Sequence, residues 1–251
     1  MFGALHFPPI EELLEWKDIA GIPGFNKVAL LCLASAAITF LFFWRAGRRA
    51  EMVPRGTQNV AERAVEFVQE SIVMQTMGPE GLYWTPFLLT VFMFLLVANL
   101  FEVVPLVQFP PTARMAVPMP LALLVLVLFL VMGFKRQGPG YFKAALVPPD
   151  VPKPLYVLVV PIEFFSTFLM RPFSLAVRLF ANMLAGHLLL VTFAVLSAAL
   201  FTKSVMVVLL PLPVAMLLGV TIFEVLVAVL QAFIFTILTA VYIGEAMHPQ
   251  H

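Results

Sequence analysis

Residues 205–244 read VMVVLLPLPVAMLLGVTIFEVLVAVLQAFIFTILTAVYIG, and Glu224 is the only charged side chain among them. A helix of this length measures about 60 Å, about twice the thickness of the hydrocarbon core of a bilayer. The run therefore predicts a membrane helix that is strongly tilted, kinked or partly in the membrane plane. A similar run, residues 155–201, precedes it, and Lys203 marks the corner of the expected hairpin. The alternative is that each run is two short spans with a hidden turn.

Three shorter apolar runs precede the hairpin, at residues 28–44, 87–107 and 116–134. Each is close to the roughly 20 residues that cross a bilayer as a helix. Residues 57–77 alternate charged and apolar side chains with a helical period, which predicts an amphipathic helix at the membrane surface. The predicted fold is an all-α polytopic membrane protein, residues 1–251 as a single domain. It has five transmembrane helices, one surface helix and an N-terminal segment at residues 1–26.

The composition excludes several classes of protein. Hydrophobic residues make up 62% of the chain and charged residues 12%, against about 25% charged residues in a soluble domain. The net charge of +1 gives nucleic-acid binding no electrostatic basis. The sequence has no phosphate-binding glycine loop, nucleophile elbow or Cys/His metal spacing, and the tail histidines His248 and His251 lack further ligands. We therefore expect no catalytic site, cofactor or metal on this chain.

Lysine and arginine are unevenly distributed between the connections. Residues 45–63 hold five of them and residues 135–153 hold four, whereas the opposite connections hold only Arg114 and Lys203. Because basic residues concentrate in cytoplasmic loops, we expect the N-terminus outside and the C-terminus inside the cell.

Ionisable side chains within a membrane are costly and indicate function by default. In the hairpin they are Glu163, Arg171, Arg178, His187 and Glu224. At about 100° per residue, Glu163 and Asn182 share one helix face with Arg178. His187 lies on the opposite face of the same helix.

The hairpin also predicts which residues lie at the same depth. If the corner is near 202–203, Arg178 lies at the depth of Gln231, and His187 lies at the depth of Glu224. Gln231 and Glu224 share a face of the last helix. An acid and a histidine at one depth could exchange protons, each changing the pKa of the other.

Other roles are open for these side chains. Arg178 has apolar sequence on both sides and cannot easily reach the surface, whereas Arg171 could extend to the inner surface or be functional. His187 alone could be a packing residue, and Asn182 and Gln231 could hold the two helices together or line a water path. We expect Glu102 at the headgroup level and Glu245 in a solvated tail.

Residues 171–187, RPFSLAVRLFANMLAGH, resemble the signature of the F-type ATP synthase subunit a family. Residues 224–239, EVLVAVLQAFIFTILT, resemble the last helix of that family, and a Pro-Phe-Leu, Ala-Asn99-Leu and Pro105 pattern in the second span is similar too. The resemblance covers most of the chain from about residue 84 and is weak before it.

The resemblance implies a proton-translocating stator subunit of a rotary F-type ATP synthase in a bacterial plasma membrane. Its hairpin would lie beside a ring of c subunits, with b-type peripheral stalk subunits and the rest of the synthase as further partners. Two offset half-channels would carry H⁺ to and from the ring carboxylates. Alanines 181 and 185 and Gly186 would let the ring approach closely.

The resemblance also assigns roles to residues. Arg178 would separate the half-channels. The outer one would use Asn182, His187, Glu224 and Gln231, and the inner one would lie near Glu163 and Ser166. Some relatives carry the acid and the histidine in exchanged positions, which keeps one of each.

Two other classes remain as alternatives. A stand-alone proton-coupled transporter usually shows internal repeats, and none is found here. A structural or assembly protein of the membrane would not need Arg178. Selectivity for H⁺ over Na⁺, the ring size and the preferred direction are open.

Overall fold

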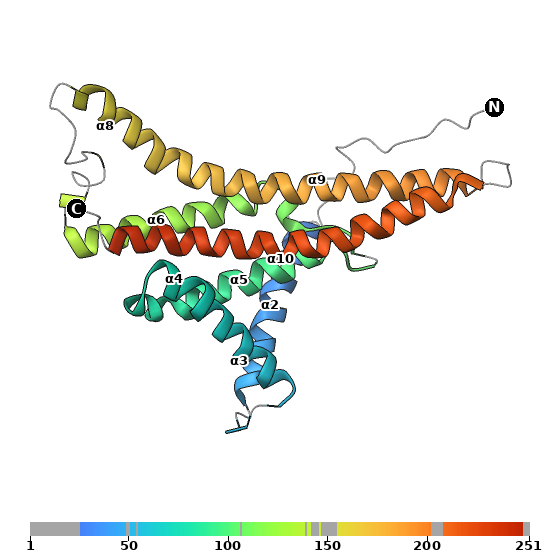
Figure 1. Ribbon diagram of the computed structural model, residues 1–251, viewed down its shortest axis with the longest axis horizontal. Helices are drawn as coiled ribbons and strands as arrows, with labels where there is room; N and C mark the ends of the chain where they lie inside the picture. The colour runs from blue at the N-terminus through green and yellow to red at the C-terminus, as the bar shows by residue number, and fades with distance from the viewer. Residues whose placement is uncertain are drawn as a thin grey trace.

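The computed structural model describes residues 26–48, 51–53, 55–105, 107–138, 140–141, 146, 155–201 and 208–247. Five helical segments within them are long and apolar enough to cross a membrane: Lys27–Arg48, Pro79–Leu100, Pro118–Gln137, Tyr156–Leu200 and Pro211–Met247. The described residues form helices and their connections (Figure 1). The predicted all-α fold with five spans is confirmed. Residues 1–25, the hairpin corner at 202–203, His248 and His251 lie outside the described residues.

The first three spans begin and end at residues that explain their limits. Helix α2 (Lys27–Arg48) begins after Asn26, whose side-chain oxygen accepts hydrogen bonds from the amides of Val28 and Ala29 at 3.1 and 3.2 Å. Helix α5 (Thr85–Leu100) follows a 3₁₀ turn, Pro79–Trp84, and ends before the 101–107 segment that was expected inside the span. Helix α6 (Pro118–Gln137) ends at Gly138, whose φ of 62° is unfavourable for other residues.

The amphipathic segment is a continuous helix that packs on the bundle. It consists of α3 (Thr57–Val68), a π turn (Gln69–Val73) and α4 (Met74–Thr76). Its charged side chains are exposed, whereas Val68, Ile72 and Val73 are fully buried. The segment contacts α2, α5 and α10, so its apolar face packs against protein helices.

The two long runs form a hairpin of uninterrupted helices. Helix α8 (Tyr156–Phe164), a π turn (Phe165–Met170) and α9 (Arg171–Leu200) make one limb, and α10 (Pro211–Met247) makes the other. No hidden turn divides either limb in the described residues. Figure 1 shows α9 alongside α10, with α8 turned away from it. Pro172 explains the π turn, because it has no N–H to donate to the carbonyl four residues earlier.

The hairpin has one buried face and one exposed face. Leu175, Leu179 and Met183 of α9 are buried in a core shared with α5, α6 and α10. The opposite face of α9 and α10 is exposed and mostly apolar; its members include Phe173, Arg178, Ala181, Ala185, Leu189, Phe223 and Leu230. This surface is called the hairpin face below.

The connection from α5 to α6 turns back into the protein. Its 3₁₀ turn, Pro111–Ala113, is buried and contacts α9. The Thr112 hydroxyl donates to the Asn99 side-chain oxygen at 2.7 Å, and the Asn99 amide donates to the Ala228 carbonyl oxygen at 3.5 Å. Irregular backbone at membrane depth is tolerated where protein surrounds it and satisfies its polar groups. Asn99 therefore joins the connection to α10.

Replacing Asn99 with alanine should leave the buried Thr112 hydroxyl without its acceptor. We expect a loss of about 1–3 kcal/mol of stability, because an unsatisfied buried polar group keeps its full desolvation penalty. Thermal denaturation of the detergent-solubilised complex measures this loss. Thr112→Ser keeps the hydroxyl and is the control. Equal melting temperatures for Asn99→Ala and wild type would contradict the joining role.

Candidate functional site

Arg178 stands at the midpoint of the 45-residue limb Tyr156–Leu200, 22 residues from either end. Its side chain is exposed on the hairpin face and forms no hydrogen bond or ion pair with any described residue. A lone cation on a mostly apolar membrane surface is expensive to place against lipid. The geometry requires water or an anionic group opposite this face.

A hollow of about 370 Å³ opens between α9 and α10 beside the hairpin face. Asn182, Gly186, Glu224 and Gln231 line it. The Asn182 amide donates to the Gln231 side-chain oxygen at 2.7 Å. We expected Gln231 at the depth of Arg178. It pairs instead with Asn182, which lies one helical turn after Arg178 on α9.

Gly186 makes room for the Glu224 carboxyl group. A methyl group added at Gly186 would overlap all three atoms of that carboxyl, so any side chain there would force the Glu224 carboxyl to shift. Gly186 was expected to let a partner ring approach closely, whereas in the structure its free side is occupied by Glu224. Glu224 is 3% exposed, and its Oε2 atom has no hydrogen-bond partner among the described residues.

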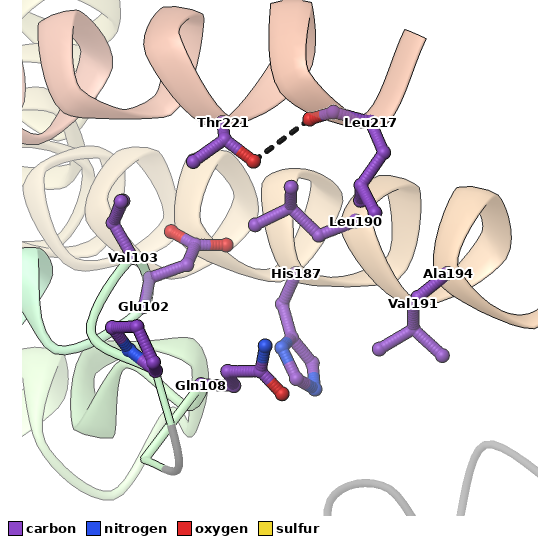
Figure 2. Close-up of a pocket in the computed structure, with 10 residues that line it drawn as sticks. Glu102, Val103, Gln108, His187, Leu190, Val191, Ala194, Leu217 and Thr221 are labelled. Atoms are coloured by element: carbon purple, nitrogen blue, oxygen red, sulfur yellow. Dashed lines mark hydrogen bonds between the residues drawn. The ribbon is translucent and has the colours of Figure 1, made fainter. Parts of the chain in front are cut away.

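A second hollow, of about 240 Å³, lies on the other side of α9 (Figure 2). Glu102, Gln108, His187 and Thr221 are among its lining residues. His187 is 5% exposed, and the ring of Phe109 meets it edge to face at 5.2 Å between ring centres. His187 and Arg178 thus occupy opposite sides of α9.

Glu102 is the functional candidate that sequence reasoning missed. It was expected at the headgroup level, but it is 2% exposed and neither carboxyl oxygen has a hydrogen-bond partner among the described residues. Burial, and to a smaller extent the Glu224 carboxylate, raises the pKa of Glu102 to about 8. A signal was present in the sequence, since Glu102 follows Asn99 by three residues in an apolar stretch.

The remaining candidates lie elsewhere on the hairpin. Glu163 is partly buried and Ser166 is exposed, and neither side chain forms a hydrogen bond with a described residue. The π turn at Phe165–Met170 separates Glu163 from Arg178, so the 100° spacing used to align them does not hold across it.

Arg171 has partners within the chain. Its guanidinium forms an ion pair with Glu245 and lies over the ring of Tyr242, 5.3 Å from the ring centre. Glu245 is exposed, as expected for a solvated residue, but it lies in the last turn of α10 and pairs with α9 and so is not part of a free tail.

The described residues form a helical membrane bundle in which an arginine lies without a described partner on an apolar face, with buried acids and a histidine behind it, and this combination is typical of membrane subunits that move ions. The ATP synthase A chain family profile matches residues 29–244. The chain belongs to this family.

Curated relatives agree over nearly the whole chain. ATP synthase subunit a of Frankia alni is 45% identical over 97% of this chain and 87% of its own length. Subunit a of Rhodococcus erythropolis is 40% identical, covering 97% and 90%. Subunit a of Rhodopseudomonas palustris is 41% identical, covering both chains completely. These similarities fit a multi-pass membrane protein that takes part in proton transport and ATP synthesis.

Gly186→Ala should displace the Glu224 carboxyl and lower ATP-driven proton pumping by roughly tenfold or more, since small misplacements of reacting groups can cost up to about 100-fold. Quinacrine quenching in vesicles measures pumping. Glu224→Asp, one methylene shorter, should restore part of the loss in the double variant. Gly219→Ala on α10 is the control, because a methyl group there meets open space. Wild-type pumping by Gly186→Ala would show that the close approach is unimportant.

Glu102→Gln should change how stability depends on pH. The folded pKa of about 8 lies above the ordinary value of 4.5, so the folded state holds a proton that the unfolded state releases between these values. Wild-type stability should therefore fall, relative to Glu102→Gln, as pH rises from about 4.5 to about 8, and then level off. Melting temperatures of the solubilised complexes between about pH 5 and 9 test this. A difference that is flat or rises with pH would contradict the burial of a neutral carboxyl.

Proposed function

We propose that this chain is the stator subunit through which protons pass to and from the rotor ring of an F-type ATP synthase. One observation carries the proposal: Arg178 is exposed at the midpoint of a membrane limb, on an apolar face, and pairs with none of the described residues. A ring of c subunits, each with a membrane-buried carboxylate, supplies the anion that this guanidinium requires. The same cation bars direct passage of protons along the hairpin face.

The outer half-channel is proposed to begin at the hollow of Glu102 and His187. Both side chains can take up and release a proton, and Glu224 lies close enough to influence Glu102 electrostatically. Glu224 lines the other hollow, of about 370 Å³, beside the hydrogen-bonded pair of Asn182 and Gln231. A proton would pass from His187 and Glu102 to Glu224 and then, across this polar pair, to a ring carboxylate.

The inner half-channel is proposed near Glu163 and Ser166. Both lie on the far side of Arg178 from the hollows, at and beside the π turn. The π turn supports this role, because such turns widen the helix locally and often occur at functional sites. Its proposed task is to release protons from the ring toward the cytoplasm.

Partners and placement follow from the same proposal. The hairpin face binds the c ring, b-type peripheral stalk subunits hold the chain still, and the remaining subunits carry the nucleotide chemistry. The N-terminus lies outside and the C-terminus inside a bacterial plasma membrane. A potential of 100 mV supplies about 2.3 kcal/mol per charge, so several protons must cross for each ATP. A ring that turns past a fixed subunit meets this requirement.

Arg178→Ala should abolish ATP-driven pumping in vesicles while the complex still assembles, because nothing then holds the ring carboxylate or separates the half-channels. Immunoblotting of the purified complex checks assembly.

The comparison variant is Arg171→Gln, seven residues earlier on the same helix. Since Arg171 pairs with Glu245 inside the chain, its loss should lower pumping far less. Pumping by Arg178→Ala at the wild-type rate would make Arg178 structural and would defeat the rotary proposal.

A further inference from the structure

The imidazole of His187 is oriented by packing alone within the described part of the chain. It forms no hydrogen bond with any described residue. Among the described residues, its ring contact is the edge-to-face arrangement with Phe109, at 5.2 Å between ring centres. A histidine that relays protons must present a given ring nitrogen to its partner, and a hydrogen bond to the other nitrogen usually ensures this. At His187, contact with the Phe109 ring takes the place of this hydrogen bond.

Phe109 is itself held firmly. It is 1% exposed and belongs to a small apolar cluster with Val28 and Leu31 of α2. The Lys27 ammonium lies 6.0 Å from the centre of the Phe109 ring and donates a hydrogen bond to the Val107 carbonyl at 3.0 Å. The start of α2 therefore supports the segment that carries Phe109.

The backbone between these anchors is strained. Gln108 has a φ of 43°, a conformation that residues other than glycine rarely adopt. Such outliers persist where surrounding contacts enforce them, and they cluster at functional sites. Figure 2 shows the Gln108 side chain at the hollow beside His187. The next side chain, Phe109, is buried.

We propose that Phe109, anchored to the start of α2, is a positioning residue that holds the His187 imidazole at the hollow that Glu102 also lines. This inference rests on the proposed role of His187 as a proton relay. It extends the functional assembly to α2, a helix that none of the sequence-predicted site residues occupies. The charged and titratable groups around the imidazole come from three elements: Lys27 of α2, Glu102 after α5 and Glu224 of α10.

The test uses the assembled complex in vesicles and a double-mutant cycle. Phe109→Leu should lower proton pumping roughly tenfold, the size expected for a misplaced reacting group, and should shift the pH profile of pumping. In a His187→Gln background, Phe109→Leu should cause no further loss, because there is no imidazole left to position. Phe109→Met, which fills similar space without a ring, replaces Phe109→Leu if that variant does not assemble.

Phe101→Leu is the matched control. Phe101 packs against the same apolar cluster but has no ring contact with His187. The pH profile of proton pumping by Phe101→Leu should therefore match that of the wild type. Equal losses from Phe109→Leu in both backgrounds, or the same pH shift from Phe101→Leu, would overturn the positioning role alone. Unchanged pumping by His187→Gln would overturn the relay role as well.

Discussion

The cost of a charge inside a membrane governs this structure. Arginine at the centre of a membrane helix costs about 2.5–3.5 kcal/mol even by insertion experiments. Arg171 and Arg178 lie seven residues apart, yet Arg171 meets Glu245 and the Tyr242 ring, and Arg178 meets no described partner. The fold satisfies the first arginine, whereas no described residue satisfies the second. The exposed hairpin face is thus incomplete by itself.

Polar contacts set the register of the hairpin. Arg171 with Glu245, Asn182 with Gln231, and Gly186 with Glu224 cross from α9 to α10 in succession. Apolar packing alone distinguishes poorly between neighbouring registers, because lipid tails are as apolar as leucine. A slip of one residue would separate the Asn182–Gln231 pair and drive the Glu224 carboxyl into a side chain. The groups proposed to conduct protons therefore also align the helices.

Hydropathy and the cost of buried charge were enough to predict the five spans and the long hairpin. The depth argument was less exact, since it assumed straight helices and a corner near 202–203. It put Gln231 level with Arg178, and the structure pairs it with Asn182. The π turn could not be predicted, because Pro172 indicates a kink without specifying its form. Glu102 was missed because its burial depends on the 108–117 connection, which packs under α9 through contacts distant in sequence.

The carboxyl groups of Glu102 and Glu224 lie close together, and neither accepts a hydrogen bond from the described residues. Both Glu102 oxygens and one Glu224 oxygen lack partners, and like charges in a poorly solvated place resist ionising together. At neutral pH the pair is therefore expected to keep at least one proton between its members. Within the proposed path, losing a proton to the ring would charge Glu224 and leave Glu102 holding its own. Glu102 would then hold the next proton to pass to Glu224. His187, which lines the same hollow as Glu102, would supply a new proton to Glu102.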